Sequence, residues 1–124
     1  MSRILIEKAQ RLLEREVGTI RSTLDGKLKF ALAFPSSYRL GMSALGFQLV
    51  YGMLNSVPGV VCERVFLPGP ADIKEFKRSR TRLFTLESQA PLYDFDVIAF
   101  SISYELDYTG IAKILDLAGL PIFA

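Results

Sequence analysis

Two almost uninterrupted apolar segments constrain the fold of this chain more than any other feature. Residues 28–34 read LKFALAF, and residues 96–103 read DVIAFSIS. Neither alternates apolar and polar side chains as a half-exposed strand does, so both predict strands covered on two faces, as in parallel sheets flanked by helices. A third segment, VVCERVF at 60–66, predicts another strand, and its Glu63 and Arg64 indicate a position nearer the edge of the sheet.

Helical patterns fill the intervals between these strands. Residues 3–20 space their apolar side chains as an amphipathic helix does, and further helices are predicted over 44–57, within 68–80 and over 108–118. Strands that alternate with helices are typical of an open α/β sheet with right-handed crossovers. We therefore expect a mostly parallel, Rossmann-like sheet with helices on both faces. The apolar stripe of the second predicted helix consists of Leu45, Leu49 and Met53, with Val50 and Leu54 beside it.

The remaining segments suggest how the chain is divided. RLFTLES at 82–88 predicts a short strand or an extended segment, and the final LPIFA reads as the start of one more strand. A doubly wound domain does not usually end on the first residues of an apolar strand, so we interpret the chain as a truncated piece of a longer protein. Residues 1–24 then form an N-terminal helix and connection, and residues 25–124 form a partial domain.

Composition excludes several classes of protein. The chain has 124 residues, enough for one domain with a real core, and half of them are hydrophobic. The formal net charge of +2 is too small to argue for binding to nucleic acid or to an anionic membrane. No apolar run is long enough to span a membrane, and the N-terminus carries too many charges for a signal peptide. We therefore expect a cytoplasmic location.

The chain is also poor in the side chains that carry most enzyme chemistry. Cys62 is the only cysteine, so no internal disulfide can form, and we expect it to pack as a small apolar side chain. There is no histidine, which removes the commonest general base and the commonest metal ligand. We therefore expect neither a zinc site nor an iron–sulfur cluster built from this chain alone. If chemistry occurs here, a group from outside the chain must carry most of it.

The segment FPSSYRLGMSALG, residues 34–46, is the first candidate for a functional site. It follows a predicted central strand, and ligands of open parallel sheets bind at the carboxyl ends of the strands. Its serines offer hydroxyls, its glycines let a backbone approach a ligand, and Ser43 is expected to cap the next helix. The Gly-x-Gly-x-x-Gly and Gly-Lys-Ser/Thr patterns are absent. The alternative is an ordinary strand-to-helix connection with tightly packed glycines. The candidate residues are Ser36, Ser37, Tyr38, Gly41, Met42, Ser43 and Gly46.

A second candidate segment, SISYELDYTG at 101–110, follows the other buried strand and should open onto the same crevice. Ser103, Tyr104 and Glu105 are its candidate ligand-binding residues, and the alternative is that Tyr104 packs while Glu105 begins a helix. The basic segment KEFKRSRTR at 74–82 is interpreted as a solvated helix face, because no aromatic platform accompanies it.

Several blocks of sequence resemble a known family. YRLGMSALGFQLVYGMLNS, VCERVFLP, LFTLES, PLYDFDVIAFSISYELDY and ILDLAGLP occur in order between about Phe30 and Ala124. Together they resemble the N-terminal region of a bacterial radical S-adenosylmethionine (SAM) family, whose members begin with a cobalamin-binding-like Rossmann domain. The resemblance implies that a downstream barrel carries a four-iron cluster on a Cys-x-x-x-Cys-x-x-Cys motif together with the SAM site. None of those ligands is in this chain, so the fragment alone is expected to be inactive.

The resemblance also implies a function for the fragment. It would present a corrin or a substrate to the iron–sulfur domain, with cobalamin held without a histidine ligand from this chain, since there is none. The cofactor-binding residues of the two segments above would contact it. Two alternatives stay open: a cofactor-free module that packs on the barrel or on another partner, and a flavodoxin-like flavin-binding domain. Because an unfinished sheet exposes a strand edge and apolar helix faces, we also expect self-association.

Overall fold

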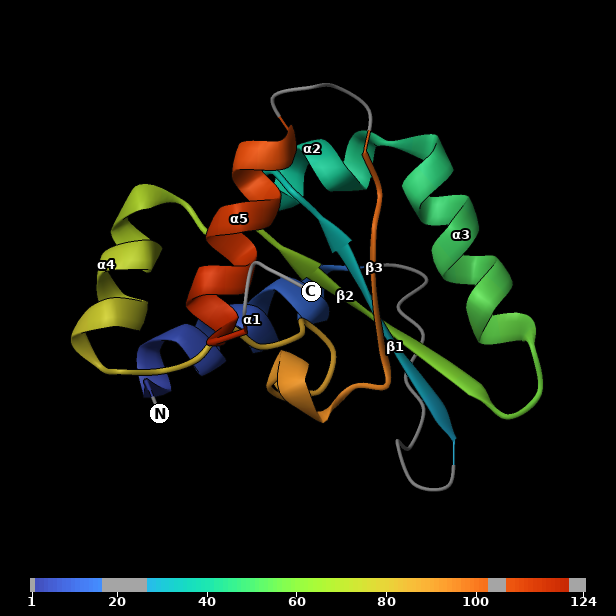
Figure 1. The fold of residues 1–124 in the computed structure, drawn as a ribbon, viewed down its shortest axis with the longest axis horizontal. Coiled ribbons are helices and arrows are strands. Elements are labelled where there is room, and N and C mark those ends of the chain that lie inside the picture. The colour runs from blue at the N-terminus through green and yellow to red at the C-terminus, as the bar shows by residue number, and fades with distance from the viewer. Residues whose placement is uncertain (1, 17–26, 103–106, 121–124) are drawn as a thin grey trace.

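The computed structural model describes residues 2–16, 27–102 and 107–120. Three parallel strands form the sheet, in the order β2-β1-β3: β1 is Leu28–Phe34, β2 is Val60–Phe66 and β3 is Val97–Phe100. Figure 1 shows helices on both sides of this sheet. The predicted open, parallel α/β architecture is therefore confirmed. The helices are α1 (Arg3–Arg15), α2 (Tyr38–Ser43), α3 (Leu45–Ser56), α4 (Pro70–Arg78), the 3₁₀ helix η1 (Leu92–Asp94) and α5 (Asp107–Ala118).

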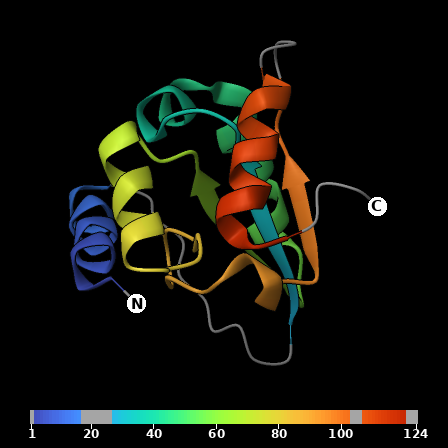
Figure 2. The same cartoon turned by 60° about the vertical axis from the view of Figure 1, so that its left-hand side comes forward.

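The side chains of β1 divide the core between the two faces of the sheet. Leu32 packs with Phe47 and Tyr51 of α3 on one face. Ala31 and Ala33 point to the other face, where they share a larger core with residues of α1, α4 and α5. Figure 2 shows α5 lying across this second face, with α4 and α1 beside it. The two alanines leave little bulk on the central strand, which lets α5 pack close to it.

Other parts of the chain form hydrogen bonds with the backbone groups on the outer edge of β2. The side chain of Asn55 accepts from the N–H of Cys62 at 2.9 Å and donates to its carbonyl at 3.0 Å. The N–H of Leu86 donates to the carbonyl of Arg64 at 2.7 Å, and Glu87 Oε1 accepts from the Arg64 N–H at 2.8 Å. The predicted edge position of β2 is confirmed, and this edge is closed to further strands.

Two details differ from the expectations from sequence, and a third concerns a point that the sequence pattern left open. Residues 82–88 add no strand to the sheet, because Leu86 and Glu87 cover the β2 edge and only an isolated bridge joins Phe84 to Pro91. Part of the predicted 34–46 connection is the helix α2. The stripe of Leu45, Leu49 and Met53 lies on the exposed side of α3, because Phe47 and Tyr51 occupy the side against the sheet.

Candidate functional site at the carboxyl edge of the sheet

The two candidate segments leave the sheet at the same edge. β1 and β3 are parallel neighbours, and the N–H of Ser101 donates to the carbonyl of Ala33 at 2.9 Å. The first turn of α5 also touches the end of β1, since a Cβ added to Gly110 would lie 2.1 Å from the carbonyl oxygen of Pro35. The expectation that both strands end at one edge is confirmed. Ser103, Tyr104 and Glu105 lie outside the described residues.

The hydroxyls of Ser37 and Ser43 make local hydrogen bonds. Ser37 is the N-cap of α2, where its Oγ accepts from the N–H of Leu40 at 3.3 Å. Ser43 Oγ donates to the carbonyl of Arg39 at 3.0 Å, and α3 begins after Ala44 without a side-chain cap. The prediction that Ser43 caps the following helix is therefore wrong, because a turn of helix already precedes it. The carbonyl of Ser36 accepts from Leu67 at 2.9 Å, which ties the end of β1 to the end of β2.

The two glycines of this segment have different surroundings. A Cβ added to Gly41 would lie 2.3 Å from Cε1 of Phe66, so the space beside Gly41 is filled by the aromatic ring at the end of β2. A Cβ added to Gly46 would meet no atom within 4 Å, and Gly46 is exposed on α3. Gly41 therefore lets α2 pack closely on the end of β2.

A buried charge cluster lies beneath α2, and sequence analysis did not find it. Arg64 is 1% exposed, and its Nη2 lies 2.7 Å from Glu16 Oε1 while its Nε lies 2.6 Å from Glu87 Oε2. Its guanidinium also stacks 4.5 Å above the centre of the Tyr51 ring. Burial opposes the charge of Arg64, but the neighbouring carboxylates outweigh this effect and raise the pKa of the guanidinium. Burial raises the pKa of Glu87 against the attraction of Arg64.

The charge cluster contacts two of the predicted site residues. The hydroxyl of Tyr38 donates to Glu16, and Arg64 Nη1 lies 3.4 Å from the sulfur of Met42. Burial, together with the hydrogen bond to Glu16, raises the pKa of Tyr38 to about 12. Tyr38 therefore stays protonated at neutral pH and serves as a hydrogen-bond donor. Tyr38 and Met42 thus connect the first candidate segment to the charge cluster.

A second buried carboxylate lies beside this cluster on β2. Glu63 Oε1 accepts from the hydroxyls of Thr85 and Ser88, both at 2.6 Å. Because Glu63 and Glu87 are both used to hold 85–88 against β2, their role here is structural. The signal that could have located these residues was the pair Glu63-Arg64 inside an apolar strand, since buried charges must be paired.

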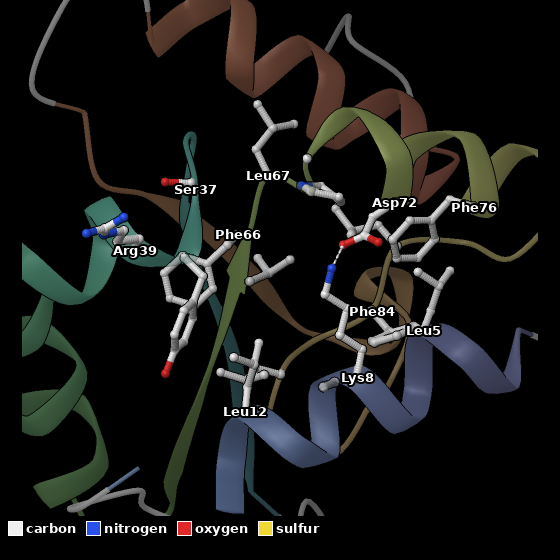
Figure 3. A pocket seen from close by; sticks show the side chains of 17 residues that line it. Leu5, Lys8, Leu12, Ser37, Arg39, Phe66, Leu67, Asp72, Phe76 and Phe84 are labelled. Carbon is white, nitrogen blue, oxygen red and sulfur yellow. Dashed lines mark hydrogen bonds and ion pairs between the residues drawn. The ribbon is translucent and has the colours of Figure 1, made fainter. Parts of the chain in front are cut away.

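An apolar groove opens at the carboxyl edge between α1, α2 and α4 (Figure 3), and its cavity volume is about 350 Å³. Its walls are mostly apolar, and Ser37, Tyr38 and Arg39 supply polar groups where β1 ends. Lys8 and Asp72 form an ion pair of 2.6 Å between α1 and α4 at the other side. The residues that line this groove are Leu5, Lys8, Ala9, Leu12, Ser37, Tyr38, Arg39, Val65, Phe66, Leu67, Pro68, Gly69, Asp72, Phe76, Leu83, Phe84 and Leu86.

α1 forms one wall of the groove and is anchored at both ends. At its start, the Ser2 N–H donates to Thr81 Oγ1 at 2.7 Å and the Ser2 hydroxyl donates to Glu75 at 2.6 Å. Hydrogen bonds from Arg78 and Ser2 lower the pKa of Glu75 to about 2. After its last turn, Glu16 pairs with Arg64. The groove therefore has a wall held in place at two points.

The cations of the basic segment at 74–82, and Cys62, lie outside the groove lining. The cations of the 74–82 segment are exposed, as expected, and Arg78 pairs with Glu75 at 2.8 Å. Cys62 is buried in the sheet, and burial with the charge of Glu87 raises the pKa of its thiol to about 12. Among the described residues, no helix is long and apolar enough to cross a membrane.

Residues 46–124 match the family described as radical SAM proteins, N-terminal. The chain belongs to this family. No curated protein and no solved structure matches the chain. The match covers α3, β2, α4, β3 and α5. The α1 and α2 walls of the groove lie outside the matched residues.

The donor set of this radical SAM N-terminal region does not fit the cofactors of a radical SAM reaction. A four-iron cluster takes several thiolates, whereas the chain has one cysteine, and it is buried. Within the described part of the chain, no three potential ligands lie close enough to hold a metal ion. The first candidate segment and the groove leave little space for a corrin among the described residues. Phe66 fills the space beside Gly41, and a groove of 350 Å³ is at the lower end of the ~300–1,000 Å³ of drug-sized sites.

Proposed function

We propose that this region holds a small, largely apolar substrate, or the apolar part of a larger one, and presents it to a radical SAM domain. The observation that carries the proposal is the apolar groove at the carboxyl edge, which is where ligands of open parallel sheets bind. Two of the residues that sequence analysis selected, Ser37 and Tyr38, contribute to its wall.

The polar groups of the groove suggest the chemistry of the ligand. Arg39 is exposed and has no ion-pair partner among the described residues, whereas Lys8 is neutralised by Asp72. Figure 3 places Ser37 and Arg39 on the same side of the groove. An apolar body with an acidic group at this end would satisfy both features. Radical chemistry on such a ligand would be carried out by the cluster and SAM of another domain.

A corrin is the second candidate ligand. The family resemblance supports it, since related domains bind cobalamin, whereas the groove of about 350 Å³ is at the lower end of the size of small-ligand sites. Mixing the chain with hydroxocobalamin, or with flavin mononucleotide, and removing free ligand by desalting separates these cases. A retained corrin spectrum supports cobalamin and a retained flavin spectrum supports a flavodoxin-like role. If neither spectrum is retained after desalting, the substrate groove and the cofactor-free docking module remain as the two interpretations.

The groove itself is tested with 1-anilinonaphthalene-8-sulfonate, an apolar probe with one anionic group. Its fluorescence on binding gives a dissociation constant for the chain. Leu12→Trp fills the groove and is expected to weaken binding at least tenfold, equivalent to about 1.4 kcal/mol. Arg39→Gln should weaken binding severalfold, because it removes the cation beside the sulfonate.

Two control variants test whether the probe binds in the groove. Arg11→Gln removes an exposed cation from the outside of α1, and Leu49→Lys removes an apolar side chain from α3. Both should bind the probe as the original chain does. If Leu12→Trp binds the probe unchanged while Leu49→Lys does not, the probe site is on α3 and the groove proposal is wrong.

A further inference from the structure

The outer face of α3 is apolar and carries no charge. The whole helix, LGFQLVYGMLNS, contains no Asp, Glu, Lys or Arg. Leu45, Leu49 and Met53 are 73%, 57% and 67% exposed. A helix that is apolar on all sides is normally buried, because an exposed apolar face loses the free energy of transfer out of water. Figure 1 shows α3 at the right-hand margin, with no other labelled element outside it.

Exposed apolar side chains concentrate around this face. Six of the twelve large hydrophobic side chains that are exposed in the described chain lie between Leu40 and Val57. Isolated apolar residues on a surface are ordinary, but a contiguous group of them indicates an interaction site. The same helix buries Phe47 and Tyr51 on its other side. The exposed face is therefore additional to the one that packs on the sheet.

The shape of the outer face of α3 is self-complementary, so that two copies of this face can fit together. Gly46 is an open notch, since a Cβ added there would meet nothing within 4 Å, and Met53 is a projecting side chain seven residues later. Seven residues are two helical turns, so notch and projection lie on the same side of α3, about 10 Å apart. Leu49 and Val50 lie midway between them. A two-fold axis beside Leu49 and Val50 would place Met53 of each copy over Gly46 of the other.

We propose that α3 is the interface of a homodimer in which two copies pack their outer faces in antiparallel orientation. An isologous interface requires a surface that complements itself, and the notch, the projection and the central pair meet that requirement. Because neither face carries a charge, the two copies bring no like charges together. Glycine at the contact lets the two helices approach closely.

The size of the face indicates the strength of the pair. A standard interface takes about 800 Å² from each partner, roughly a tenth of the 7597 Å² surface of this chain. One face of a twelve-residue helix, about 18 Å long, is smaller than that. We therefore expect a weak dimer, with a dissociation constant in the range of about 10–300 µM.

Sedimentation equilibrium of the chain tests the dimer over that concentration range. Leu49→Lys puts a charge beside the proposed axis and should raise the dissociation constant at least tenfold. The matched control is Ile4→Lys, the same kind of change at an exposed apolar residue of α1. It should leave the dissociation constant unchanged. A chain that stays monomeric at about 1 mM, or a Leu49→Lys variant that dimerises as well as the original, would overturn the proposal.

Oxidative cross-linking tests the antiparallel orientation. Protein carrying Gly46→Cys, mixed with protein carrying Met53→Cys, should form a disulfide-linked dimer faster than either protein alone. In each homodimer the new thiols would be about 10 Å apart, too far for a disulfide. The native Cys62 is buried with a raised pKa and does not compete. Equal rates for the mixture and for the single variants would indicate unspecific association and would also overturn the proposal.

Discussion

Gly41 and Gly46 are five residues apart in one candidate segment, yet the structure gives them opposite surroundings. From the sequence, both are predicted to be positions where a ligand could approach the backbone. Gly41 is in contact with Phe66 of the same chain, and Gly46 faces open space on α3. A glycine pattern alone cannot separate these two cases, because the partner of Gly41 is 25 residues further along the chain.

Gly41→Ala should lower the free energy of unfolding by about 1–3 kcal/mol, the usual cost of overpacking against an aromatic ring. Gly46→Ala should leave it unchanged or raise it by up to about 1 kcal/mol, because alanine favours the helix and meets no atom. Urea unfolding followed by circular dichroism measures both. A Gly41→Ala variant as stable as the original would show that Phe66 moves aside at no cost.

Among the described residues, Arg64 is the only cation in the buried cluster. Its removal takes away the ion pairs that it forms with Glu16 and Glu87. We expect Arg64→Met to cost about 3–5 kcal/mol of unfolding free energy near neutral pH. The matched control is Arg78→Met, which breaks an exposed ion pair with Glu75 and should change the unfolding midpoint little.

The pH dependence of the Arg64→Met deficit gives a second check. Burial already raises the pKa of Glu87, and removal of the guanidinium raises it further. The folded variant then takes up a proton at a higher pH than the unfolded chain does. Its deficit should therefore be largest near pH 8 and should shrink as the pH falls toward 5. A deficit that is constant with pH would mean that both carboxylates find other partners.

At the scale of elements, the strands of the sheet could be predicted from the sequence. The packing of residues 82–88 and of α3 against the sheet could not. The segments at 28–34 and 60–66 coincide with β1 and β2, because strands covered on two faces leave a largely apolar pattern, which Glu63 and Arg64 interrupt in β2. The role of 82–88 depends on Glu87 reaching Arg64, a contact between distant residues that no local pattern encodes. The exposed stripe of α3 was read correctly as helical, but periodicity cannot tell which of two apolar faces meets the sheet.

The contact of α5 with the end of β1 predicts the effect of a second glycine change. In Gly110→Ala the added carbon would overlap the carbonyl of Pro35, which is backbone and cannot rotate away. We expect a loss of stability larger than that of Gly41→Ala and chemical-shift changes at Ala33 and Ser101. Gly52→Ala is the control, since its added carbon meets no atom within 4 Å. Equal stability of the two variants would contradict the close approach of α5.

At the scale of the molecule, the described residues place an apolar groove at the edge where ligands are expected. Sequence analysis identified that edge, and it selected Ser37 and Tyr38 in the wall. It could not anticipate the groove, because α1 contributes Leu5, Ala9 and Leu12 from the far end of the chain. The chain belongs to the radical SAM N-terminal family, and we propose that this edge presents a ligand to another domain.

The position of a bound probe tests the central claim most directly. In heteronuclear NMR of the isotopically labelled chain, 1-anilinonaphthalene-8-sulfonate should shift the amide signals of Leu12, Tyr38 and Leu67, which surround the groove. The signals of Leu49 and Met53 on α3 should stay in place at the same probe concentration. Shifts confined to α3, or no saturable shift around the groove, would contradict the account.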